Sequence, residues 1–214
     1  MTADYIGPAV IAAVTVDLDD TLFPQSAWLA GAWSDVATAA ATFGLDGDGL
    51  LEHLIATGSP ASVSTADAAR TIAQALGAIG VSEVELPAVA PGVMAAFLAH
   101  APSELECFPG VEVALSALRS VVPVACITDG DPHVQRTKLR ALGLSDSFDA
   151  VVFSEELAPA HEAARERALQ LLGVDPAQAI HVGAASATSS RARRWQVGAD
   201  PAATLRSLTE LARA

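Results

Sequence analysis

Short, almost wholly apolar runs that alternate with helical patterns are the feature that most constrains this chain. Four of them occupy residues 122–128, 150–153, 179–183 and, more weakly, 195–197, and helical patterns separate them. Runs of this length are typical of strands in a parallel sheet, where helices cover both faces. A further run at 10–16 completes the set. The alternation predicts an α/β fold: a Rossmann-like, doubly wound parallel sheet.

The helices of this core have recognisable ends. Proline lies in the first turn of one pattern and glycine follows another, as at many helix starts and ends. The sequence predicts core helices at 111–120, 132–142, 162–172 and 201–213.

The stretch between the first and second predicted strands breaks the alternation. It is too long for an ordinary strand-to-strand crossover, and it shows helical patterns only. These predict helices at 26–43, 48–56, 64–76 and 90–99, with Pro87 in a turn before the last. We therefore expect an α/β core domain of residues 1–22 and 105–214, with an inserted all-α cap domain at 23–104.

The composition limits the classes of partner that we expect this protein to bind. The formal net charge is −13 and 51% of residues are hydrophobic, so we expect a folded protein that binds neither nucleic acid nor membranes. A small molecule, and even an anionic one, stays compatible with this charge because a local site can override it. We find no export signal and expect a cytoplasmic protein with two reduced cysteines, Cys126 being buried. The sequence does not specify an oligomeric state.

Two acids follow the first predicted strand directly. Asp17 and Asp19 are two residues apart, at the end of a strand where ligands bind in parallel sheets. One carboxylate can attack an electrophile while the other transfers protons. An acidic turn that only ends the strand is the alternative, since Asp is common in turns.

A longer pattern extends this interpretation. Residues 17–23 resemble the first motif of the haloacid dehalogenase-like hydrolases. Residues 127–132 resemble the second motif of that family, 153–156 continue the pattern, and 181–183 are similar to the start of the fourth motif. The cap shares only its helical character with the family's helical caps.

The resemblance implies a role for each matching residue. Asp17 is expected to be the nucleophile and Asp19 the acid/base, as in the phosphatase members. Asp17 and the backbone carbonyl of Asp19 are also the expected magnesium ligands. Thr128, Asp129 and Gly130 are expected to hold the transferring group, where hydrogen-bond donors stabilise developing negative charge.

Two family features are missing. No lysine follows residue 156, and the only lysine of the chain, Lys138, lies where the family also carries an ordinary surface lysine. His161 or Arg165 could supply the missing cation, or both could be surface helix residues. After Gly183, no Asp or Glu occurs before Asp200, so we expect magnesium to bind weakly.

These losses lead to our functional hypothesis. A phosphate monoester beside two carboxylates creates like-charge pairs, each costing about 4 kcal/mol at about 4 Å and an effective dielectric of about 20. We expect a hydrolase of phosphatase type by resemblance, with weak or altered activity and a preference for a less charged substrate. Two alternatives stay open: a non-catalytic ligand-binding or regulatory protein, and a metal-independent hydrolase.

Weaker candidates lie elsewhere. Trp28 and Trp33 could line a substrate pocket, and their five-residue spacing allows at least one of them to be exposed or near the cleft, but packing in a core or interface is the better explanation. His181 is better explained as a core histidine with a satisfied hydrogen bond than as a ligand. The arginines at 191, 193 and 194 are best explained as one solvated helix face.

Overall fold

The computed structural model describes residues 11–57, 64–157, 160–183, 193–196 and 200–213. Its contacts divide the chain into two compact units. The α/β unit comprises Met1–Leu22, Cys107–Thr128 and Asp146–Ala214; the helical unit comprises Phe23–Glu106 and Asp129–Ser145. The sequence-based division placed 129–145 in the core domain, whereas the contacts group this segment with the helices of the insert.

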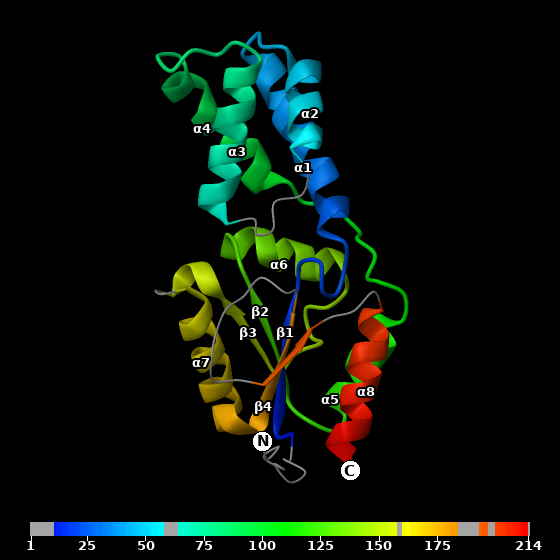
Figure 1. The fold of residues 1–214 in the computed structure, drawn as a ribbon. Helices are drawn as coiled ribbons and strands as arrows, with labels where there is room; N and C mark the ends of the chain where they lie inside the picture. The colour runs from blue at the N-terminus through cyan, green and yellow to red at the C-terminus, as the bar shows by residue number, and fades with distance from the viewer. Residues whose placement is uncertain (1–10, 58–63, 158–159, 184–192, 197–199, 214) are drawn as a thin grey trace, which may run out of the picture. The chain divides into compact units, whose positions relative to one another are not determined.

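The α/β unit is built on one parallel five-stranded sheet (Figure 1). Its spatial order is β3-β2-β1-β4-β5, so the chain starts in the middle of the sheet and winds first one way and then the other. This confirms the predicted doubly wound α/β fold. The strands are β1 Ala13–Asp17, β2 Val124–Thr128, β3 Ala150–Phe153, β4 Ala179–Gly183 and β5 Arg193–Gln196.

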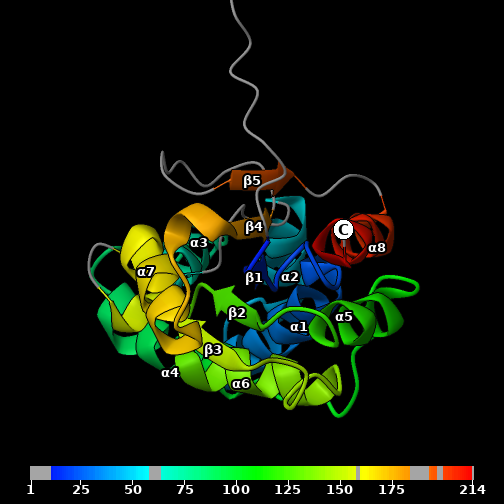
Figure 2. The same cartoon turned by 90° about the horizontal axis from the view of Figure 1, so that it is seen from below.

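Within the described ranges, three helices cover the two faces of this sheet. One face packs against α7, and α5 and α8 lie on the opposite face, in contact with each other (Figure 2). Two short 3-10 helices flank α7. The elements are α5 Val111–Arg119, η1 Ser154–Glu156, α7 Ala160–Leu172, η2 Pro176–Gln178 and α8 Pro201–Arg213.

Alternation along β1 distributes its side chains between these two faces. Ala13 packs with Leu169 of α7 and Ala179 of β4, so odd-numbered residues of β1 face α7. Val14 and Val16 are fully buried and point toward the opposite face. The face of β1 that ends at Asp17 is therefore the α7 face.

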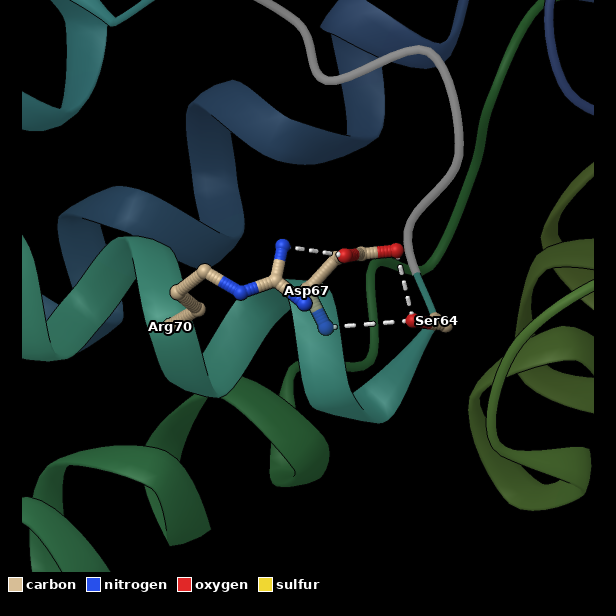
Figure 3. A network of polar contacts seen from close by, with 3 residues as sticks. All are labelled: Ser64, Asp67 and Arg70. Atoms are coloured by element: carbon tan, nitrogen blue, oxygen red, sulfur yellow. Dashed lines mark hydrogen bonds and ion pairs between the residues drawn. The ribbon is translucent and has the colours of Figure 1, made fainter.

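The helical unit contains α1 Gln25–Thr42, α2 Gly47–Ala56, α3 Thr65–Ala78, α4 Leu86–Ala99 and α6 Pro132–Ala141. Helix α4 begins four residues before the predicted 90–99, because Pro87 lies in its first turn rather than in a loop, a position that tolerates proline. Helix α3 begins with a Ser64 N-cap, whose hydroxyl accepts a hydrogen bond from the Asp67 amide at 3.1 Å (Figure 3). No helix in the described ranges is long and apolar enough to cross a bilayer.

Aromatic side chains form the core of the helical unit. Trp28 and Trp33 are 0% and 3% exposed, so the favoured prediction that they pack in a core is confirmed, and neither is exposed as their spacing allowed. Phe97 of α4 lies between them, with ring centroids 5.1 Å from Trp28 and 5.0 Å from Trp33. The rings of Phe97 and Trp28 meet in an edge-to-face arrangement, which is a favoured geometry for aromatic pairs.

Candidate active site

The two acids of the first motif lie at the carboxyl end of the central strand. Asp17 is the last residue of β1 and is half-buried, fully buried Leu18 follows it, and Asp19 is also half-buried. The chain then turns sharply: the Leu22 amide donates to the Leu18 carbonyl at 2.9 Å, and Asp20 has a φ of 54°. A non-glycine residue in this left-handed region is uncommon, and Asp tolerates it better than most. The tight turn holds both carboxylates near the strand end.

The topology makes this strand end a natural binding position. The chain passes from β1 to β2 and β3 on one side, then crosses to β4 on the other side of β1. The crossovers therefore diverge between β1 and β4, and such a switch point opens a crevice at the carboxyl ends of the strands. Asp17 lies on β1, directly at this point.

Gly183 ends β4 beside Asp17. A β-carbon built at Gly183 would lie 3.3 Å from the Asp17 Cβ and 2.9 Å from the His181 Nε2. These distances are tighter than ordinary van der Waals contact, so a larger residue would displace one of these neighbours. Glycine at this position therefore allows Asp17 and the His181 ring to approach each other.

His181 is hydrogen-bonded inside the sheet. Its Nδ1 lies 3.0 Å from the Thr15 hydroxyl, and Thr15 pairs with it in the register of β1 and β4. The prediction of a histidine with a satisfied hydrogen bond is confirmed. Its neighbours, however, include the candidate nucleophile, which strand position alone could not reveal.

The pKa of the Cys126 thiol reflects the negative charge of this region. It is fully buried in β2, as predicted, and pairs with Val16 of β1. Burial raises the pKa of its thiol well above the ordinary value, and the charges of Asp17 and Asp19 raise the pKa further. The thiol is therefore held neutral close to two carboxylates.

The second-motif residues fall in both units. Thr128 is 1% exposed and ends β2, the strand beside β1, so it lies at the same edge of the sheet as Asp17. Asp129 and Gly130 belong to the helical unit. There the Gln135 side-chain amide donates to the Asp129 carbonyl at 2.6 Å, and Gly130 has a φ of 112°, which suits glycine.

Two cations that could have been surface residues are buried in the structure. Lys138 is fully buried rather than on the surface, with its Nζ 4.6 Å from the Trp28 ring centroid and 6.0 Å from that of Phe23. Arg165 is also buried, at 6% exposure, so the surface alternative is wrong for it. The His161 side chain lies outside the described residues.

The helical spacing of apolar residues could have indicated that Lys138 and Arg165 are buried. Lys138 is four residues after buried Val134, and Arg165 is four residues before buried Leu169, so each lies on the apolar stripe of its helix. The predicted helix face of arginines was also wrong in part, because positions 193 and 194 open strand β5. Arg191 lies outside the described residues.

The donor set does not fit a resident magnesium ion. Magnesium takes six oxygen ligands in near-octahedral geometry, and carboxylates supply most of the affinity. Within the part of the chain that the structure describes, no group of three or more His, Cys, Asp or Glu side chains could hold a metal ion. The acidic donors at the end of β1 are Asp17 and Asp19, and the sequence offers no acid between Asp175 and Asp200.

Comparison with known proteins places the fold in context. A family model described as haloacid dehalogenase-like hydrolase matches residues 11–186. No curated protein matches the sequence at a significant level.

Several solved structures are similar to this chain. A 2-haloacid dehalogenase from Pseudomonas syringae pv. tomato is 27% identical, with 81% of this chain and 78% of that chain covered and a TM-score of 0.53. A haloacid dehalogenase-like hydrolase from Xanthomonas campestris is 21% identical over 96% and 94%, with a TM-score of 0.56. A haloacid dehalogenase-like family hydrolase from Streptococcus pneumoniae is 21% identical over 82% and 77%, with a TM-score of 0.57.

Proposed function

Because this chain belongs to the haloacid dehalogenase-like hydrolases, we propose that it is an aspartate-nucleophile hydrolase whose small-molecule substrate carries less negative charge than a phosphate monoester. The observation that carries this proposal is the position of Asp17, which ends the central strand at the point where the crossovers diverge. Asp19, half-buried in the turn that follows, is the proposed acid/base.

The proposed chemistry has two steps. The Asp17 carboxylate attacks an electrophilic carbon, and the leaving group departs with its bonding electrons to give an aspartyl ester. Water then attacks the ester carbonyl, so that the alcohol product leaves with the original carboxylate oxygen and Asp17 regains its carboxylate. Asp19 accepts one proton of the attacking water and later releases it to solvent, and the other proton goes to the departing alkoxide to give the alcohol. Thr128, Asp129 and Gly130 are the proposed contacts to the substrate.

Charge decides between substrate classes. A phosphate monoester would bring two further negative charges to a strand end that already carries Asp17 and Asp19. The donors described above do not form a magnesium site, so that repulsion is not offset by a metal. A substrate with a single negative charge meets less repulsion, and attack at carbon leaves no phosphoryl oxygens to neutralise. Phosphatase-type turnover is therefore expected to be weak.

One relative supports the same substrate class. The Pseudomonas syringae protein, 27% identical to this chain, is described as a 2-haloacid dehalogenase. A 2-haloacid carries one carboxylate and an electrophilic carbon bonded to halogen, which matches the charge argument. We propose short 2-haloacids as the first substrates to test.

Ligand binding without turnover is a second candidate. The absence of acidic residues between Asp175 and Asp200 favours it, because the family's fourth motif normally carries acids there. A protein of this kind would still bind a small molecule near Asp17 but would not release product. Turnover measurements separate the two candidates.

The test compares two substrates and two variants. We expect 2-chloropropionate to release chloride without added metal, and p-nitrophenyl phosphate with magnesium to react more slowly. Asp17→Asn should lower chloride release by at least about a thousandfold, equivalent to about 4 kcal/mol. Asp20→Asn is the matched control, because Asp20 is exposed and Asn tolerates its left-handed backbone. Rapid, magnesium-dependent phosphate release abolished by Asp17→Asn would instead establish an ordinary phosphatase.

A further inference from the structure

The α7 face of the sheet changes character along its length. At the amino end, Ala13 and Ala179 pack against Leu169 of α7, and this row is apolar. Two residues further along these strands, Thr15 of β1 and His181 of β4 lie side by side, joined by their hydrogen bond, with Ala125 of β2 on the other side of Thr15. The next row contains Asp17 and Gly183. On β1 and β4, a polar pair of buried Thr15 and half-buried His181 thus lies between the apolar base of the strands and the candidate nucleophile.

Arg165 occupies the matching place on α7. This helix links two parallel strands, β3 and β4, so it runs opposite to them (Figure 1). Four residues of helix rise about 6 Å and two residues of strand advance about 6.6 Å. Arg165 precedes Leu169 by one turn on the same stripe, which places its backbone over the row of Thr15 and His181.

The Arg165 side chain extends from its backbone toward Asp17. Side chains on a helix lean toward the helix N-terminus. The N-terminus of α7 lies at the carboxyl end of the strands, so the Arg165 side chain leans toward the row that contains Asp17. Arg165 is 6% exposed, and a buried guanidinium is costly unless a carboxylate or other acceptor meets it.

We propose that Arg165 offsets the negative charge of Asp17 from the α7 face of the sheet, in the role of the lysine that this chain lacks after residue 156. The proposal deepens the proposed function, because it names the residue that keeps the nucleophile charged and oriented. Arg165 acts through Asp17 as a positioning residue. Because Arg165 approaches Asp17 from α7, the side of the carboxylate at the carboxyl ends of the strands stays accessible to the substrate.

Other acids compete for Arg165. Glu155 and Glu156 of η1 precede α7, and Asp19 follows Asp17. Both glutamates are exposed to solvent, where screening makes an ion pair weak, whereas Asp17 is half-buried. Asp19 is half-buried too, but it lies in the turn beyond β1, whereas Asp17 ends the face of β1 that packs against α7. A strong coupling is therefore expected with Asp17, and a weak one with Glu155.

A double-mutant cycle on the full chain measures this coupling without any substrate. Asp17→Asn and Arg165→Met are made singly and together, and the unfolding equilibrium constant is measured in urea. We expect Arg165→Met to raise that constant at least about tenfold less in the Asp17→Asn background than in the wild type, a coupling of about 1.4 kcal/mol. The cycle with Glu155→Gln should give less than about threefold.

Two further variants complete the design. Arg167→Met, at an exposed position on the same helix, is the matched control and should be additive with Asp17→Asn. If Arg165→Met does not fold, Arg165→Lys replaces it, because the shorter ammonium weakens the contact but keeps the charge. That cycle should still show a coupling of about threefold.

The outcomes distinguish this proposal from the function it rests on. Additivity between positions 165 and 17, in either cycle, overturns the pairing whether or not the protein turns over 2-chloropropionate. A coupling that appears only with Glu155 overturns it as well. Loss of the proposed function would show as no Asp17-dependent chloride release, and the unfolding cycle would remain readable.

Discussion

Among the side chains that the structure describes, each of the two units buries one Lys or Arg, and the two cations differ in what surrounds them. In the helical unit, Lys138 lies over the ring of Trp28, with Phe23 also nearby. In the α/β unit, Arg165 of α7 is buried, and we infer that it lies over the hydrogen-bonded pair of Thr15 and His181 that precedes Asp17. An aromatic ring stabilises a cation without being a reactive group. The carboxylate at the end of β1, in contrast, is the candidate nucleophile.

This difference separates a structural charge from a functional one. The aliphatic stem of Lys138 fills space among aromatic side chains, so its contribution should depend mainly on volume. Arg165 should contribute mainly through its charge, because its proposed partner is an acid. Substitutions that remove volume and charge separately can therefore distinguish the two positions.

The largest expected effect is at Lys138. We predict that Lys138→Ala lowers the free energy of unfolding by about 3 kcal/mol, because it leaves a cavity beside Trp28. Lys138→Met keeps the volume and should cost less than about 1.5 kcal/mol. Urea denaturation followed by circular dichroism measures both. Equal losses for Met and Ala would show that the charge of Lys138 matters as much as that of Arg165, and the contrast between the units would disappear.

A smaller effect is expected at the strand end beside Asp17. Gly183→Ala places a methyl group 2.9 Å from the His181 Nε2 and 3.3 Å from the Asp17 Cβ. We predict a loss of about 2 kcal/mol in the free energy of unfolding, together with weaker chloride release, because Asp17 must shift. The matched control, Gly77→Ala, meets no atom within 4 Å and should be neutral or slightly stabilising. An unchanged Gly183→Ala protein would show that the site tolerates movement of Asp17.

The smallest effect is expected at the surface of the helical unit. Ser64→Ala removes the N-cap of α3 and should cost about 1 kcal/mol. The Ser64 hydroxyl also donates to the Asp67 carboxylate at 2.7 Å, and this hydrogen bond, with a smaller contribution from Arg70, lowers the pKa of Asp67 (Figure 3).

This shift in pKa gives the Ser64 prediction a pH dependence. A lowered carboxylate pKa adds stability above the unfolded-state value of about 4 and loses it as the pH falls further. The difference between wild type and Ser64→Ala should therefore be largest near pH 7 and shrink in acid. A difference that is constant from pH 7 to pH 3 would assign the whole effect to the cap.

Much of the fold could be predicted from the sequence, because periodicity and helix ends are local signals. The five strands and eight longer helices predicted from the sequence occur at nearly their expected positions, and Pro87 shifted the start of α4 because proline fits both a turn and a first helical turn. The site was predictable only in part. Asp17 could be identified from the strand that precedes it, but the burial of Lys138 and Arg165 depends on which helix face meets a neighbour. Charged residues are usually exposed, and this tendency outweighed the periodic signal at both positions.

The most direct measurement of the central claim follows the oxygen that enters Asp17. One turnover of 2-chloropropionate is run in water enriched in the heavy oxygen isotope, with enzyme in excess, and the protein is digested for mass spectrometry. Because water attacks the aspartyl ester at its carbonyl, we predict one heavy oxygen in the peptide that contains Asp17, located on the Asp17 side chain itself. Heavy oxygen found only in the released product, with Asp17 unlabelled, would contradict a covalent role for Asp17.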